Sequence, residues 1–140
     1  MAGAGVMKKA LLDTNIVSAF IRGDASVAKN ARKYLQEHKR FTLSIITYYE
    51  LMRGIKAIDS DKKSIMFQDF IRECSLIELD HFIAEKAAEI YDSLRRKGQL
   101  IEDADILIAA TALVHDLIMV TGNIRHFERI PGLSMENWKD

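Results

Sequence analysis

The chain contains one cysteine and one proline in 140 residues, and its apolar runs are short. The lone cysteine, Cys74, excludes an internal disulfide framework and a zinc site built on paired cysteines. It is typical of a small core residue in a reducing compartment. The apolar runs at 106–110 and 117–120 are far shorter than the roughly 20 residues that span a bilayer. We therefore expect a cytoplasmic protein without a membrane segment.

The sequence also lacks net charge, because 20 basic residues balance 20 acidic ones. This balance argues against a protein that coats nucleic acid by bulk positive charge. It still allows an enzyme whose bound cations reverse the charge of an acidic site. No Gly-rich phosphate loop and no Gly-x-Ser-x-Gly elbow occurs, and the four histidines show no metal-ligand spacing. Nucleotide-binding motifs and serine hydrolase motifs are therefore absent.

What the chain does contain is an alternation of strand and helix patterns. The hydrophobic fraction of 49% is enough for one domain with a substantial core, which we expect to span residues 7–140, with residues 1–6 as an extension outside the fold. The patterns predict strands at 8–13, 41–46, 75–79 and 117–120 and helices at 14–21, 25–38, 47–55, 60–73, 82–97 and 103–115. This alternation predicts an α/β fold with a mainly parallel sheet and helices on both faces.

Asp13 directly follows the first apolar strand, at the carboxyl end where ligands bind in open α/β sheets. A carboxylate in this position requires donors or a cation to offset its burial. The alternative is a cap for the helix that follows, a position where Asp is common.

Two further acids are candidates for the same site. Glu50 lies in a largely apolar stretch, where the alternatives are a capping-box role with Thr47 as the cap and an exposed pairing with Arg53 three residues on. Asp105 leads into a helix that is apolar all round, and is therefore expected to lie at the inner end of a buried helix. Asp103 is the better candidate for the cap of that helix. Asn123 follows the last strand and belongs either to the same pocket or to an ordinary turn.

Together these side chains offer oxygen ligands with few basic neighbours. Clustered carboxylates repel one another unless cations lie between them. Oxygen-only ligands favour Mg²⁺ or Mn²⁺ over zinc. Such a site is suited to phosphodiester hydrolysis.

Four segments then resemble the PIN-domain nucleases, and among them the VapC-type toxins of prokaryotic toxin–antitoxin pairs. They are LLDTNI at 11–16, SIITYYELMRG at 44–54, IEDADILIAATA at 101–112 and VTGNIRHF at 120–127, and the closing IPGL and ENW are also similar to the family. The resemblance implies a PIN-like three-layer sandwich with a sheet of four to five strands. It also implies a homodimer and a cognate antitoxin that inserts a side chain, often Arg, toward the acids.

The resemblance assigns the family's three acids to Asp13, Glu50 and Asp105, and implies Mg²⁺- or Mn²⁺-dependent cleavage of RNA that leaves a 5′-phosphate. Asn15 takes the polar position after the first acid, and Asn123 takes the fourth pocket position. The remaining assignments are Asp103 as a further metal ligand, His126 where many relatives carry an acid, and Arg22, Arg53 and Arg125 as candidate phosphate contacts. A housekeeping RNA-processing nuclease and a catalytically inactive RNA- or protein-binding module are the alternative functions.

Overall fold

A fully parallel sheet forms the middle layer of the structure, a computed structural model that describes residues 7–139. The predicted extension at 1–6 lies outside the described residues. Within them the sheet has five strands in the order β3-β2-β1-β4-β5. The strands are β1 (Ala10–Leu12), β2 (Thr42–Ser44), β3 (Ser75–Ile77), β4 (Ile118–Val120) and β5 (Met135–Glu136). The predicted α/β class and parallel sheet are confirmed.

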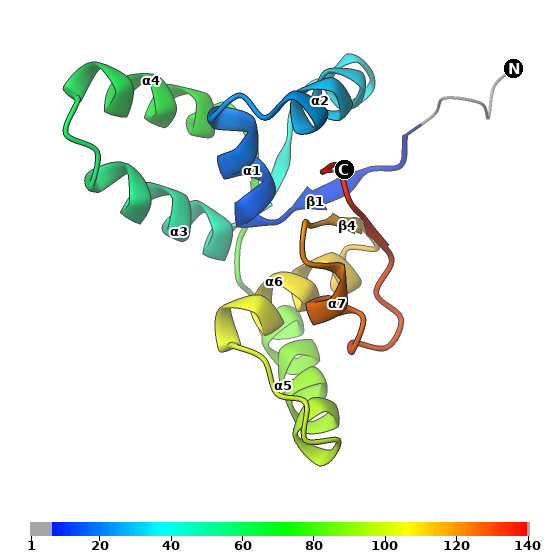
Figure 1. The fold of residues 1–140 in the computed structure, drawn as a ribbon. Coiled ribbons are helices and arrows are strands. Elements are labelled where there is room, and N and C mark those ends of the chain that lie inside the picture. The colour runs from blue at the N-terminus through cyan, green and yellow to red at the C-terminus, as the bar shows by residue number, and fades with distance from the viewer. Residues whose placement is uncertain (1–6, 140) are drawn as a thin grey trace, which may run out of the picture.

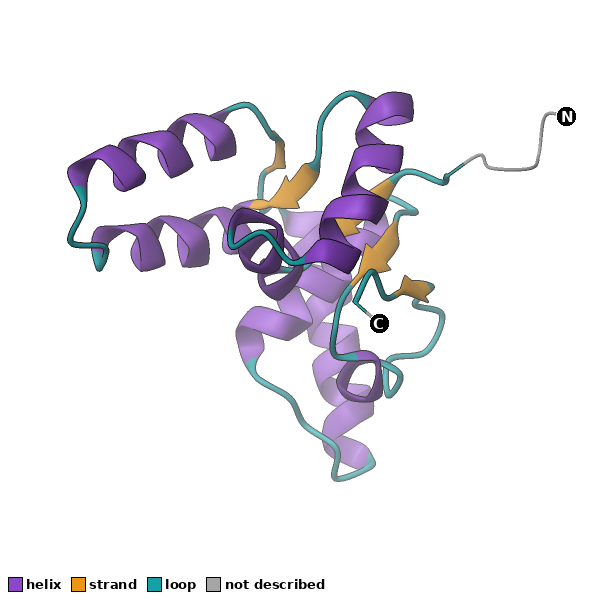
Figure 2. Ribbon diagram, turned by 45° about the horizontal axis from the view of Figure 1, so that its top comes forward, coloured by secondary structure: helices purple, strands orange, loops and turns teal. Residues whose placement is uncertain are grey.

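Helices cover both faces of this sheet (Figures 1 and 2). One core lies among α1 (Thr14–Ile21), α2 (Ala25–His38), α3 (Ile45–Lys56) and α4 (Asp61–Arg72). The other lies among α5 (His81–Arg96), α6 (Asp103–Val114) and α7 (Ile124–Phe127). The three-layer sandwich is therefore present as predicted.

The central strand β1 separates the two cores. Ala10 and Leu12 pack into the first core, whereas Leu11 packs into the second. Successive side chains of a strand point to opposite faces, so both faces of β1 are buried. This explains why the strand is a continuous apolar run, and why its carboxyl end lies between the two helical layers.

The start of α3 differs from the prediction. Residues 45 and 46 were expected to extend the second strand to 46, with Thr47 as the helix cap, but β2 ends at Ser44 and α3 begins at Ile45. The cap is Ser44, whose hydroxyl accepts a hydrogen bond from the Thr47 backbone N–H at 3.0 Å. The β-branched pair at 45–46 favours a strand, but this cap and the packing of Ile46 into the second core stabilise a helix.

Smaller differences occur at other element ends. The strand predicted at 75–79 ends at Ile77, and the helix predicted from residue 82 begins at His81 because Asp80 caps it. The expected stop after the first helix is present, with Gly23 in the left-handed region at φ 86°. None of the helices in residues 7–139 has the length and apolar character needed to cross a bilayer.

Candidate active site

Asp13 is buried, with 5% of its surface exposed, at the point where β1 ends and α1 begins. Its Oδ1 accepts a hydrogen bond from the Thr14 backbone N–H at 2.8 Å. Its Oδ2 accepts one from the Thr121 hydroxyl at 3.0 Å. Asp13 is therefore a helix cap and also a buried carboxylate at the carboxyl edge of the sheet, so the two alternatives for this residue coexist.

Glu50 is half-buried on α3 and faces the same edge. Because Ser44 caps α3, Glu50 is free of a capping-box role. Its Oε1 lies 2.6 Å from the hydroxyl oxygen of Thr14, which donates to it. The same Thr14 hydroxyl lies 3.2 Å from that of Thr47. Thr14, the residue after Asp13, thus links the first acid to Glu50.

Asp105 is half-buried in the first turn of α6. Its Oδ2 lies 2.9 Å from Nε2 of His126, which comes from α7. An ionised carboxylate only accepts hydrogen bonds, so Nε2 carries the proton in this contact. His126, which stands where the family resemblance leads us to expect an acid, therefore supplies a hydrogen-bond donor to Asp105.

The three carboxylates lie close enough for their charges to influence one another's pKa. Burial raises the pKa of Asp13 above its usual range, the Thr121 and Thr14 hydrogen bonds oppose this, and the charges of Asp105 and Glu50 raise it further. Burial also raises the pKa of Asp105, with His126 opposing and Glu50 adding to the rise. The structure thus brings together three acids that are far apart in the sequence, and their repulsion favours a cation between them.

The other predicted site residues lie differently. Asn15 and Asn123 are exposed, on the first turn of α1 and before α7, and the Asn123 backbone N–H donates to the Thr121 hydroxyl at 3.0 Å. Asp103 is exposed and lines a hollow between α5 and α6 with Ala88 of α5. It is the first residue of α6 rather than its cap, a position occupied by Glu102 without a side-chain hydrogen bond.

The sequence pointed to Thr121 as a pocket residue and to His126 as a departure from the family, but it did not predict that three side chains donate hydrogen bonds to the acids. These residues are Thr14, Thr121 and His126. Thr14 and Thr121 each lie next to the end of a central strand, and small polar residues at that edge are the signal that identifies them. No such signal exists for His126, because its contact with Asp105 depends on the packing of α7 against α6.

Asp13, Glu50 and Asp105 offer carboxylate oxygens, which are the ligands that a hard divalent cation requires. As they stand, the side chains within residues 7–139 include no group of three His, Cys, Asp or Glu placed to hold a metal ion.

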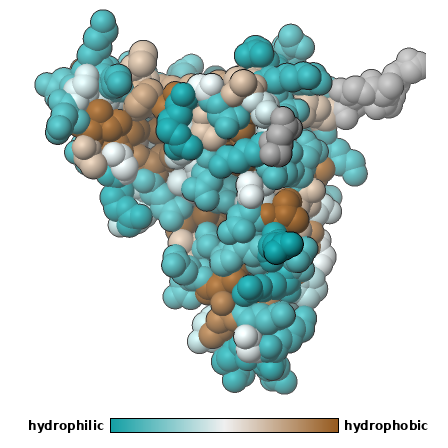
Figure 3. All heavy atoms as spheres, in the orientation of Figure 1, coloured by the Kyte–Doolittle hydropathy of each residue, from teal (hydrophilic) through white to brown (hydrophobic). Residues whose placement is uncertain are grey.

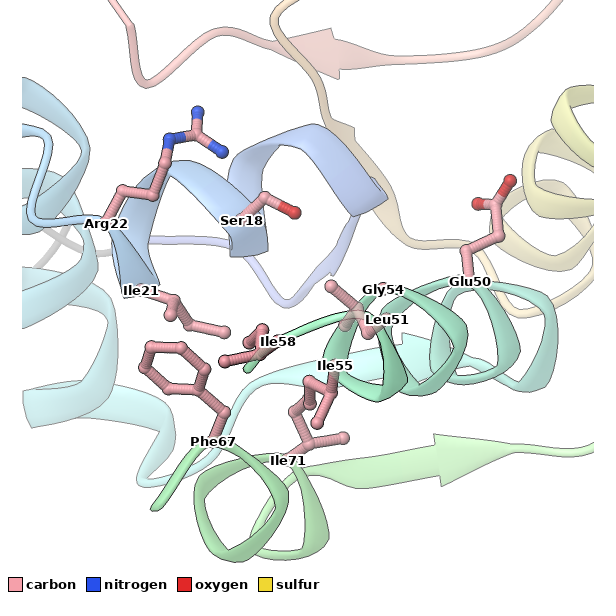
Figure 4. Close-up of a pocket in the computed structure, with 10 residues that line it drawn as sticks. All are labelled: Ser18, Ile21, Arg22, Glu50, Leu51, Gly54, Ile55, Ile58, Phe67 and Ile71. Carbon is pink, nitrogen blue, oxygen red and sulfur yellow. The ribbon is translucent and has the colours of Figure 1, made fainter. Parts of the chain in front are cut away.

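An apolar cavity of about 230 Å³ adjoins this edge, between α1, α3 and α4. Glu50 lies at one end of it, and Ser18 of α1 and Arg22, which directly follows α1, lie along one side (Figure 4). Apolar side chains gather over α3 and α4 on the surface as well (Figure 3). The rest of the lining is mainly apolar and comprises Ile21, Leu51, Gly54, Ile55, Ile58, Phe67 and Ile71.

The geometry can be compared with known proteins. A family profile described as PIN domain matches residues 10–133. The chain belongs to the PIN-domain family. It is 32% identical over 138 residues to the tRNA(fMet)-specific endonuclease VapC of Salmonella typhimurium, with 94% of this chain and 99% of that protein covered. It is also 32% identical over 133 residues to Ribonuclease VapC2 of Haemophilus influenzae, with 94% and 99% covered.

Among solved structures, the PIN-domain chain is similar to VapBC2 from Rickettsia felis, crystallised with a DNA fragment from its promoter. The TM-score is 0.83 at 29% identity, and the match covers 93% of this chain and 98% of that one. The predicted resemblance to PIN-domain proteins of the VapC type is confirmed.

Proposed function

We propose that this PIN-domain protein is a metal-dependent endoribonuclease and the toxin of a toxin–antitoxin pair. The observation that carries the proposal is the convergence of Asp13, Glu50 and Asp105 at one edge of the sheet, where their charges act on one another. Relatives named ribonuclease and endonuclease VapC support the reaction and the RNA substrate.

The three acids are the residues that would hold Mg²⁺ or Mn²⁺. Asp103 is left out of this set because it is exposed in the hollow beside α5. When bound, the cation supplies positive charge beside the scissile phosphate and acidifies the attacking water. We propose hydrolysis with in-line attack, which leaves a 5′-phosphate and a 3′-hydroxyl.

The protein's own residues hold the three acids by hydrogen bonds. Two hydrogen bonds favour the carboxylate form of Asp13 and oppose the rise in its pKa that burial causes. The exposed amides of Asn15 and Asn123 are placed at the rim, where they can orient water or a phosphate oxygen. Arg22 and Arg125, both exposed, are the proposed contacts to the RNA backbone.

Arg53 is a weaker candidate for such a contact than the other two arginines. Its guanidinium carbon lies 5.1 Å from the centroid of the exposed Tyr49 ring, and its Nη1 is 3.4 Å from the Tyr49 hydroxyl. The side chain is thus already engaged along α3. A phosphate contact by Arg53 requires it to leave this ring.

The apolar cavity beside Glu50 is the proposed docking site of the antitoxin. An amphipathic helix buries its apolar face in a groove of this kind. A basic side chain from that helix would reach Glu50 at the end of the groove and compete with the cation. The structural similarity to a VapBC complex supports an antitoxin partner. A homodimer remains a prediction, which sedimentation of the purified protein would test.

Cleavage of labelled RNA tests the proposal directly. Initiator tRNA is the first substrate to try, because a relative is named for it. We expect cleavage that needs Mg²⁺ or Mn²⁺, stops with EDTA and leaves a 5′-phosphate. D13N is expected to lower the rate by about 1,000-fold, equivalent to roughly 4 kcal/mol of barrier. The matched control is D69N, at an exposed position on α4.

Three outcomes would redirect the assignment. Cleavage by D13N at the wild-type rate would refute the proposed site. RNA bound tightly but not cut would favour the inactive binding module. A cyclic phosphate at the cut would indicate histidine chemistry. Growth arrest on expression, relieved by a small neighbouring gene, would separate a toxin from a housekeeping nuclease.

A further inference from the structure

Each of the three acids is held by a side chain from another segment, and one of these side chains differs from the rest. Asp13 and Glu50 accept from threonine hydroxyls. Asp105 accepts from an imidazole, through the 2.9 Å contact between its Oδ2 and His126 Nε2. The family resemblance gives this histidine no role.

His126 has contacts to the core besides its hydrogen bond to Asp105. Phe127, the next residue, is 1% exposed and packs in the second core. The two rings meet edge to face, with centroids 5.2 Å apart. The His126 backbone N–H donates to the Asn123 carbonyl at 3.1 Å and closes the first turn of α7. These contacts place His126 independently of its hydrogen bond to Asp105.

The contact leaves Asp105 with one oxygen engaged and one available. Within the described part of the chain, Oδ1 of Asp105 receives no hydrogen bond. The two side chains are 26% and 28% exposed, so the hydrogen bond is partly shielded from water. A carboxylate that binds a metal through one oxygen is commonly oriented by a hydrogen bond to the other.

We propose that His126 is a positioning residue that holds Asp105 by Oδ2 and presents Oδ1 to the cation of the site. When Asp105 is ionised it can only accept a hydrogen bond, so Nε2 of His126 then carries the proton and is not a metal ligand. The inference rests on the proposed function, since it concerns the same cation. It specifies that position 126 requires a hydrogen-bond donor and not an acid.

Binding of Mn²⁺ to the RNA-free protein, followed by electron paramagnetic resonance, tests this inference without an activity assay. H126Q places an amide N–H near the position of Nε2, whereas H126L keeps bulk and removes the donor. We expect the Mn²⁺ dissociation constant to rise about 10-fold or more in H126L and to stay within about 3-fold of wild type in H126Q. The matched control, H115L, changes an exposed histidine at the end of α6 and should bind like wild type.

Activity and a double variant separate positioning from damage to the fold. If His126 acts through Asp105, H126L lowers kcat at limiting Mn²⁺, and saturating Mn²⁺ restores kcat while KM for RNA stays unchanged. In a D105N background, H126L should have no further effect on Mn²⁺ binding.

Unchanged Mn²⁺ binding in H126L would overturn the inference and leave the proposed nuclease intact. H126Q as weak as H126L would also overturn it, because a donor would then not suffice. A wild-type protein that binds no Mn²⁺ and cleaves RNA in EDTA would refute the metal-dependent function itself, and the inference with it.

Discussion

The T121V substitution tests how far the Thr121 hydroxyl opposes the rise in the pKa of the buried Asp13. T121V keeps the shape of the side chain and removes the donor that lies 3.0 Å from Oδ2. That hydrogen bond is the largest contribution that lowers the pKa of Asp13 against burial. A hydrogen bond to a charged group contributes about 1.5–3 kcal/mol. Its loss therefore raises the pKa of Asp13 further in the metal-free protein.

The same change alters stability in a defined pH window. The folded pKa of Asp13 is raised above its ordinary value of 3.8, so the unfolded chain loses the proton first as pH rises. The contribution of Asp13 to the unfolding free energy is therefore fully present below pH 3.8 and declines until pH passes the folded pKa. In T121V the decline continues to a higher pH, because the folded pKa is higher. We expect the unfolding free energy of T121V to be about 1.5–3 kcal/mol lower than that of the wild type at pH 7.

Carbon-13 NMR of the Asp13 carboxyl in EDTA measures the pKa, and urea unfolding at pH 4 and pH 7 measures the deficit. The control is T111V, which removes a buried hydroxyl that donates to the Leu107 carbonyl at 2.8 Å. T111V should leave the pKa of Asp13 unchanged. If T121V also leaves that pKa unchanged, the hydroxyl does not stabilise the carboxylate and the reasoning is wrong.

Three further predictions concern the fold and the cation. L12A, at a fully buried strand position, should lower the unfolding free energy by about 2–5 kcal/mol in urea unfolding. S44A removes the cap of α3 and should cost about 1 kcal/mol, whereas S134A, at an exposed serine, should cost little. Mg²⁺ at a hundred times its Kd should raise wild-type stability by about 2.7 kcal/mol, and a similar gain in D105N would contradict the assigned ligand.

The start of α3 shows where local sequence is insufficient. Ile45 and Ile46 favour a strand by their branched side chains, yet they are helical because Ser44 caps the helix and Ile46 packs into the second core. In the site, Asp103 lines the hollow beside α5 while Asp105 contacts His126, because residues two apart on a helix face different directions.

The sequence by itself determined the alternation of strands and helices, and therefore the layers and the edge at which polar residues collect. A parallel sheet aligns the carboxyl ends of its strands, so the end of an apolar run already places Asp13 at that edge. Only the tertiary structure decided which groups hold the acids. Thr121 lies 108 residues from Asp13, and His126 lies 21 residues from Asp105. Hydrogen bonds of this kind depend on strand register and helix packing, which no local pattern records.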